Sequence, residues 1–218
     1  MRHFLFTIQL GLLFFGSTAL HAQNSTKYSL DTLRSWDCTE AAGDLNKDGI
    51  GDLAIIAIPR DEAHIKRNEA GYEYNFNQPI LAIFWGKKDG TFVCWKQYDN
   101  VVPAREDEYH SVNPSIEITP QGVLRISLEH FSSAGSWGNL NETFVFRYQQ
   151  GDFYLIGQDE DSMMRNTGEG EYTSINYLTQ KKQYRTYNAF NSKVKPREKW
   201  SRIPKKPLKR LGTQKLGE

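Results

Sequence analysis

Residues 143–157 read TFVFRYQQGDFYLIG and contain the clearest hairpin pattern in the chain. Apolar and aromatic residues dominate both of its ends, and the polar turn at residues 149–152 separates them. Two β-prone runs joined by a short turn that contains glycine are typical of a β-hairpin. The sequence therefore predicts an antiparallel strand pair at this place.

Similar patterns occur on both sides of this hairpin. Residues 53–58 and 80–85 are short apolar runs with the length and composition of buried strands. An Asp89-Gly90 turn leads from the second run into residues 91–98, and residues 116–119 and 123–128 form another hairpin with one polar face. A last pair is predicted at residues 172–178 and 183–187. No stretch of about 12 residues shows helical amphipathicity. We predict an all-β fold of antiparallel hairpins.

Loops are expected between these strands. Residues 60–78 are charged and irregular, and a second polar segment runs through Pro103 and Pro114. Residues 132–139 are small and rich in glycine, and residues 159–170 are acidic and polar. Segments of this composition are typical of surface loops.

The N-terminus has the features of a secretory signal peptide. A basic start is followed by a mainly apolar stretch of 12 residues from Phe4 to Phe15 and by small residues that end at Ala22. We predict cleavage after Ala22 and a periplasmic or secreted protein. A membrane span needs about 20 apolar residues. Neither this run nor any later one reaches that length, so we predict no membrane span.

Charge is distributed unevenly along the chain. Residues 193–218 contain ten Lys or Arg and two Asp or Glu, whereas residues 23–192 contain 16 basic and 24 acidic residues. We therefore divide the exported chain into one β domain at residues 23–192 and a basic, Pro- and Lys-rich C-terminal tail at residues 193–218. Such a tail can contact anionic surfaces, polysaccharide or nucleic acid, or it can fold against the acidic body. Export makes nucleic acid the least suitable of these partners, and we predict no nucleic-acid partner.

The chain has two cysteines, Cys38 and Cys94. In an oxidising compartment they can form a disulfide, and they can equally remain as separate buried thiols. Only the geometry of the fold distinguishes the two arrangements.

Residues 44–52 read DLNKDGIGD and have the spacing of a calcium-binding loop. Side-chain oxygens alternate along a tight turn that Gly49 permits, and Ca²⁺ binds six to eight oxygen ligands. Carboxylates this close repel one another unless a cation lies between them. The alternative is an Asn- and Asp-rich turn that simply precedes a strand. We predict a structural Ca²⁺ ion held by Asp44, Asn46, Asp48, the carbonyl of Ile50, and Asp52.

The loop is not an EF-hand, because Ile55 stands where an EF-hand has its bidentate Glu. The segment from Ala42 to Pro59 instead resembles an FG-GAP or VCBS-type repeat, which occurs in the calcium-binding blades of integrin-α-like β-propellers. The resemblance implies the same five ligands. A full propeller has several such repeats and this chain has one. We therefore expect blade-like sheets or a sandwich, and not a complete propeller.

Residues 79–177 also resemble a group of uncharacterised secreted bacterial proteins that combine one such loop with a segment like residues 143–157. This resemblance implies the same architecture. It implies no activity.

Candidate catalytic residues are few. Glu129 and His130 lie near Ser132, Ser133 and Ser136, but the chain lacks a Gly-x-Ser-x-Gly elbow. The histidines and cysteines do not have zinc-ligand spacing. We predict no catalytic residues and regard an enzymatic function as the weaker interpretation.

The function that we expect is binding. Residues 132–139 and 159–170 would contact a protein or glycan partner. Trp137 can stack on a sugar or anchor a partner, although large aromatic side chains are mostly buried, so we expect it to fold back onto the sheet. Two alternatives remain: a hydrolase of an extracellular polymer, recognisable by paired acids in a cleft, and an envelope-resident inhibitor or immunity-type protein.

Overall fold

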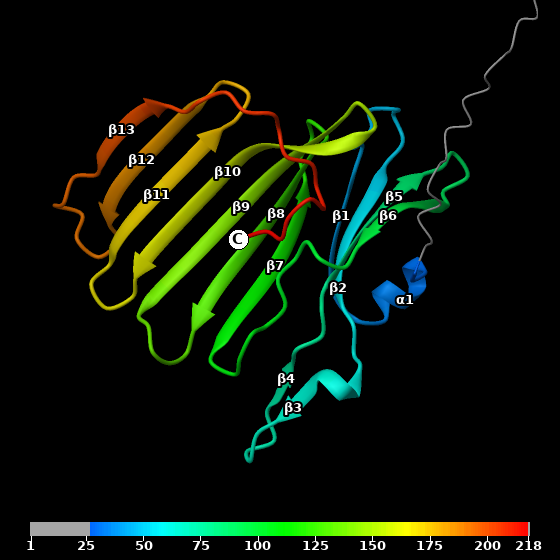
Figure 1. Ribbon diagram of the computed structural model, residues 1–218, viewed down its shortest axis with the longest axis horizontal. Helices are drawn as coiled ribbons and strands as arrows, with labels where there is room; N and C mark the ends of the chain where they lie inside the picture. The colour runs from blue at the N-terminus through cyan, green and yellow to red at the C-terminus, as the bar shows by residue number, and fades with distance from the viewer. Residues whose placement is uncertain (1–26, 218) are drawn as a thin grey trace, which may run out of the picture.

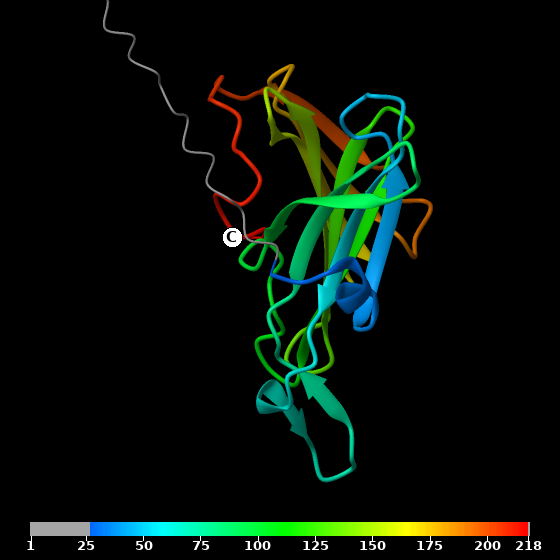
Figure 2. The same cartoon turned by 90° about the vertical axis from the view of Figure 1, so that its right-hand side faces the viewer.

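Two antiparallel sheets form the body of the molecule in the computed structural model, which describes residues 27–217 (Figures 1 and 2). The predicted signal peptide at residues 1–22 lies outside the described residues. The smaller sheet has the strand order β1-β2-β5-β6, and the larger has the order β13-β12-β11-β10-β9-β8-β7. The predicted all-β, antiparallel fold is confirmed. Residues 27–217 form neither a closed barrel nor a complete propeller.

The bounds of the elements follow the chain. The smaller sheet consists of β1 (Asp37–Gly43), β2 (Asp52–Ile58), β5 (Ile80–Gly86) and β6 (Phe92–Tyr98). The larger sheet consists of β7 (His110–Ile118), β8 (Val123–Ser132), β9 (Gly138–Gln149), β10 (Asp152–Met164), β11 (Glu169–Asn176), β12 (Lys181–Asn188) and β13 (Arg197–Arg202). The α-helix α1 (Leu30–Arg34) precedes β1, and the 3₁₀ turn η1 (Glu62–His64) leads into the hairpin of β3 (Ile65–Arg67) and β4 (Glu73–Asn75).

Strands β2 and β5 are buried on both faces, which explains why their sequences are nearly continuous apolar runs. Their inner side chains face the larger sheet. Their outer side chains, among them Ile55 and Phe84, pack under the N-terminal segment, where Leu33 of α1 is fully buried. The central strands of the smaller sheet are therefore enclosed in a three-layer arrangement.

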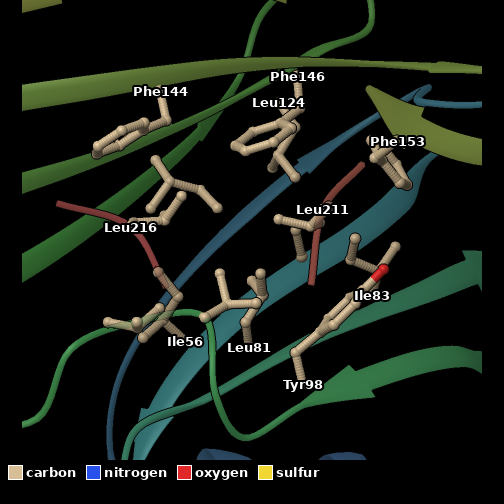
Figure 3. Close-up of a cluster of buried hydrophobic side chains, with 14 of the residues drawn as sticks. Ile56, Leu81, Ile83, Tyr98, Leu124, Phe144, Phe146, Phe153, Leu211 and Leu216 are labelled. Atoms are coloured by element: carbon tan, nitrogen blue, oxygen red, sulfur yellow. The ribbon is translucent and has the colours of Figure 1, made fainter. Parts of the chain in front are cut away.

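The main hydrophobic core lies between the two sheets (Figure 3). Leu81 and Ile83 of β5 face the alternating apolar residues of the larger sheet, such as Ile126 and Phe144, and all four are almost completely buried. Burial of apolar surface of this kind stabilises a fold by about 25 cal/mol per Å². The contact between the sheets is thus the main source of stability.

The larger sheet extends well beyond the smaller one (Figure 1). Among the described residues, the strands that contribute to the core between the sheets are β2, β5, β6, β7, β8, β9 and β10, and none of β11, β12 or β13 does so. These last three strands are held by their ladders and by side-chain contacts such as the hydrogen bond from Tyr187 to Asp161 and the stacking of Arg185 on Tyr172. They form an outlying wing that lacks a covering sheet.

Residues 203–217, which we call the C-terminal strap, run back from the wing to the core. The strap pairs with the start of β10, where Leu155 donates its backbone N–H to Lys209 and Leu211 donates to Phe153, both at 2.9 Å. It places Leu211 and Leu216 in the core, each 3% exposed (Figure 3). The segment predicted as a basic tail, residues 193–218, therefore contributes strand β13 and two core side chains.

Several predicted loops differ from the structure. Residues 60–78 form the small β3–β4 arm, whose sides are joined by ion pairs of Glu73 with Arg60 and Arg67. Pro114 lies inside β7, which is an edge strand and tolerates a residue without an N–H donor. The loop predicted at residues 159–170 is wrong in its first half, because β10 continues to Met164.

Cys38 lies on β1 and Cys94 lies on β6, at opposite edges of the smaller sheet. Three strand spacings separate these edges, about 14 Å, whereas a disulfide needs Cα atoms within about 7 Å. The two cysteines therefore do not form the bridge that the sequence left open.

The strap offers a direct test of its contribution to stability. We expect Leu211→Ala to lower the free energy of unfolding by about 2–5 kcal/mol, because it removes buried methyl groups and leaves a cavity. Leu178→Ala is the matched control, since Leu178 is 43% exposed, and it should change stability by less than about 0.5 kcal/mol. Urea denaturation measures both. Equal effects of the two substitutions would show that the strap is not part of the cooperative core.

Candidate functional site

The predicted calcium loop connects β1 to β2 and is folded by its own side chains. Asp44 accepts hydrogen bonds from the backbone N–H of Asp48 (3.1 Å) and of Gly49 (2.9 Å). Asn46 Oδ1 accepts from the same Asp48 N–H at 3.0 Å, and Asp48 Oδ1 accepts from Ile50 at 2.8 Å. Oxygens of three side chains are thus gathered on the inside of one turn.

These oxygens suit a calcium ion. Each carboxylate oxygen has about two lone-pair sites. Each of five oxygens accepts one hydrogen bond within the loop and so keeps a second site: the two of Asp44, Oδ1 of Asn46 and the two of Asp48. Asp44 and Asn46 direct oxygens at the same N–H and therefore lie close together. Oxygen ligands of this type, completed by a carbonyl or by water, match the preference of Ca²⁺.

Asp52 has a different environment from the other predicted ligands. Its side chain is fully buried, and its Oδ2 accepts the N–H of Leu45 at 2.9 Å and of Asn46 at 3.3 Å. Its Oδ1 accepts the N–H of Gly86, at the end of β5, at 3.0 Å. Burial raises the pKa of this carboxyl, and the backbone hydrogen bonds oppose the rise. Asp52 therefore fastens the loop to the neighbouring strand, and its Oδ1 retains one lone-pair site.

The loop lies where the two sheets meet. A Cβ on Gly86 would come within 2.0 Å of the Gly51 carbonyl oxygen, and a Cβ on Gly122, in the turn between β7 and β8, would come within 2.3 Å of the Asp44 carbonyl oxygen. Neither position has room for a side chain. The loop thus packs against β5 of the smaller sheet and against a turn of the larger sheet. An ion bound here would stabilise the junction between them.

In residues 27–217, no group of three or more His, Cys, Asp and Glu side chains is arranged to hold a metal ion. The predicted calcium set depends in part on the Asn46 amide and the Ile50 carbonyl, which are not among those residue types. Two short acidic runs, residues 106–108 and 159–161, have other roles. In the first, Asp107 pairs with His110 at 2.6 Å, and the second belongs to β10.

The serines near His130 do not form a catalytic set. His130 Nε2 lies 3.0 Å from Glu142 Oε2, whereas Ser133 donates to the Tyr109 carbonyl and Ser136 accepts from Gly138. Among the hydrogen bonds that the structure records for the described residues, none joins a serine to His130. Ser132 stands opposite His110 in the β7–β8 ladder, but His110 Nδ1 pairs with Asp107 and no hydrogen bond recorded for the described residues joins His110 to a serine. None of the three serines is therefore hydrogen-bonded to a base.

The hydrolase alternative requires paired acids in a cleft, and a cleft of about 530 Å³ is lined by Glu106, Glu160 and His130. The acid directly opposite Glu160 in the β9–β10 ladder is Glu142, which is not part of the lining. Glu142 is only 7% exposed, and the strap covers it, since a Cβ on Gly217 would lie 3.0 Å from Glu142 Oε2. Glu142 is therefore engaged by His130 and shielded from a substrate.

Exposed apolar side chains gather where β8 and β10 end and β9 begins. We call this surface the binding rim; it consists of Tyr109, Phe131, Trp137, Met164 and Arg165. Trp137 is 61% exposed, so the expectation that it folds back onto the sheet is wrong. Arg165 holds the β8–β9 turn: its Nη2 donates to the carbonyl oxygens of Ser132 (2.7 Å) and Ser136 (3.0 Å).

Arg165 also lies against the aromatic rings of the rim, with its guanidinium carbon 4.6 Å from the ring centre of Phe131 and 5.9 Å from that of Trp137. Cation–π contacts of this kind contribute about 0.5–1 kcal/mol at exposed sites. A groove of about 910 Å³ and the cleft of about 530 Å³ adjoin the rim and share residues such as Gly138 and Asn139. The rim is therefore an ordered, exposed surface beside two concave ones.

The different environments of Asp52 and Asp48 lead to a prediction. In calcium-free buffer, Asp52→Ala should lower the free energy of unfolding by about 3 kcal/mol or more, because it leaves three N–H groups without acceptors at a buried site. Asp48→Ala, at an exposed position, should cost about 1 kcal/mol or less. Urea denaturation in the presence of EGTA compares them. Similar losses for both variants would contradict the fastening role of Asp52.

The chain contains no helix in residues 27–217 that is long and apolar enough to cross a bilayer. The chain matches no protein-family model, no curated protein and no solved structure. The resemblance of residues 42–59 to an FG-GAP or VCBS-type repeat therefore stays a prediction based on the motif, and the function has to be argued from the geometry of the loop and the rim.

Proposed function

We propose that the protein is an exported, calcium-stabilised binding module that contacts a protein or glycan partner through the binding rim. The observation that carries the proposal is the exposure of Trp137 on a turn that Arg165 holds in place. An exposed aromatic side chain on an ordered loop loses little entropy on binding, and such residues dominate the affinity of many interfaces.

Export is supported by the signal-like N-terminal sequence, and calcium binding by the loop at residues 44–52. In this proposal Asp44, Asn46, Asp48 and the Ile50 carbonyl hold the ion, and Asp52 shares its Oδ1 with Gly86. The ion supplies charge neutralisation for the clustered carboxylates. It stabilises the junction of the sheets and takes no part in a reaction.

Binding is favoured over hydrolysis of a polymer by the environment of Glu142, the acid opposite Glu160. Glu142 is hydrogen-bonded to His130 and covered by the strap, whereas a pair of catalytic carboxylates has to flank a substrate bond. The rim, in contrast, is open on the outside of the molecule.

Calcium should raise the melting temperature of the protein. A ligand that binds only the folded state at 100 times its Kd stabilises it by about 2.7 kcal/mol. We expect this gain for the wild type and its loss for Asp48→Ala. Asp89→Ala is the matched control. The Asp89 side chain also stabilises an exposed turn, by accepting hydrogen bonds from Thr91, but it lies outside the calcium loop at residues 44–52. Differential scanning calorimetry with EGTA and with CaCl₂ measures the shift. A wild-type melting temperature that is indifferent to Ca²⁺ would refute the calcium proposal.

The rim can be tested with substitutions of exposed aromatic residues. Immobilised wild-type protein and its variants are incubated with an extract of the cell envelope and medium, and the retained proteins and polysaccharides are compared. Trp137→Ala should reduce retention of the specific partner by roughly tenfold or more, as is typical of a hot-spot residue. Tyr72→Ala is the control, since Tyr72 is 69% exposed on the β3–β4 arm. Identical retention by both variants would count against the rim.

A further inference from the structure

Strand β13 leaves a complete sheet edge open. It stands at one end of the larger sheet, and among residues 27–217 the strand that pairs with it is β12. All six of its residues are exposed, and Trp200 at its centre is 59% exposed. An open edge of this length is a template for pairing with another strand.

The ladder shows which residues turn their backbone groups toward the open edge. In antiparallel pairs, hydrogen-bonded and non-hydrogen-bonded positions alternate. Ile203 donates to Gln180 at 3.0 Å, so residues 197, 199 and 201 point their backbone groups toward β12. On the other side of β12, the backbone N–H of Ala189 donates to the carbonyl of Gly168 at 2.7 Å. This bond leads to the same assignment of inward- and outward-facing residues in β13. Glu198, Trp200 and Arg202 therefore direct their N–H and C=O groups outward.

We propose that β13 pairs with β13 of a second copy of this chain, antiparallel and about a two-fold axis at Trp200. Each Trp200 then lies opposite Trp200 of the partner subunit, and each Glu198 lies opposite Arg202 of the partner subunit. The three outward-facing residues on each side form three hydrogen-bonded pairs, and each pair exchanges two backbone hydrogen bonds. The two seven-stranded sheets become one continuous sheet.

The side chains agree with this register. Glu198, Trp200 and Arg202 project from one face of the sheet, because side chains alternate along a strand. Opposite charges that are directly across from each other stabilise a pair of strands, and so do paired aromatic residues. Trp200 Nε1 donates to Glu198 Oε1 within one chain. The second carboxylate oxygen of Glu198 remains for the guanidinium of the partner subunit.

Other registers are less favourable. A shift by one position pairs an outward-facing residue with an inward-facing one, so the backbone bonds are lost. A shift by two positions in one direction gives two hydrogen-bonded pairs in place of three and sets Lys199 opposite Lys199 of the partner subunit. The same shift in the other direction also gives two pairs and leaves both Glu198 carboxylates without an arginine. Backbone pairing and charge thus select the same arrangement.

Charged residues on an edge strand usually prevent association. Here three basic residues and one acidic residue repel most incoming strands of basic character, and the two-fold arrangement converts two of the charges into pairs. The interface is a single strand, much smaller than the roughly 1,200 Å² or more of a stable complex, so the dimer should be weak and dependent on concentration.

Analytical ultracentrifugation of the purified protein tests the proposal. The protein is measured between about 10 µM and about 1 mM, because a small interface dissociates in this range. We expect a monomer–dimer equilibrium. Glu198→Arg and Arg202→Glu should each raise the dimer Kd about tenfold or more, since each places like charges opposite each other twice. The double variant Glu198→Arg/Arg202→Glu exchanges the two charges and should restore the wild-type Kd.

Arg197→Glu is the matched control, because it makes the same charge change on β13 outside the paired positions and should leave the dimer in place. Circular dichroism and melting temperature verify that every variant is folded, as expected for exposed positions. A protein that stays monomeric at the highest concentration overturns the proposal and leaves the edge to a strand of a different protein. A dimer that survives both single variants, or a double variant that is not restored, overturns the proposed register.

Discussion

Hydrophobic packing of a four-stranded sheet against a seven-stranded sheet leaves part of the larger sheet uncovered. A sheet needs cover on at least one face, and the smaller sheet provides it only for β7, β8, β9 and β10. The C-terminal strap fills part of the remainder with Leu211 and Leu216. The wing, the grooves beside the rim and the open edge at β13 all follow from this difference in width.

The sequence predicts the strands that are buried or that alternate. The hairpin at residues 143–157 and the apolar runs of β2 and β5 lie within the observed strands, because burial leaves a pattern in the residue types. Strand β1 and strand β13 leave no such pattern. The residues of β1 are small or polar and mostly exposed, and those of β13 are mainly charged. Each of the two is held by pairing with a neighbouring strand. The residues that determine this pairing belong to the neighbour, so the sequence of β1 or β13 alone does not predict a strand.

The candidate site also has one part that the local sequence predicts and another that only the fold reveals. The spacing of residues 44–52 predicts the inward-facing oxygens of Asp44, Asn46 and Asp48, because a local turn gathers them. The link from Asp52 to Gly86 spans 34 residues of sequence and cannot be recognised without the fold. The exposure of Trp137 likewise depends on Arg165, which is 28 residues away. An arginine at the end of a polar, acidic strand segment carries no signal that it supports a distant turn.

The difference in width between the two sheets also determines the local stability of each part of the larger sheet. Backbone hydrogen bonds over the core can open only when the whole molecule unfolds, whereas those of an uncovered region can open in smaller, local units. The backbone amides of β12 and β13 should accordingly exchange with solvent far sooner than those of β8 and β9. The protein is therefore expected to have a gradient of local stability, from a rigid body at the sheet junction to a more readily opened outer wing.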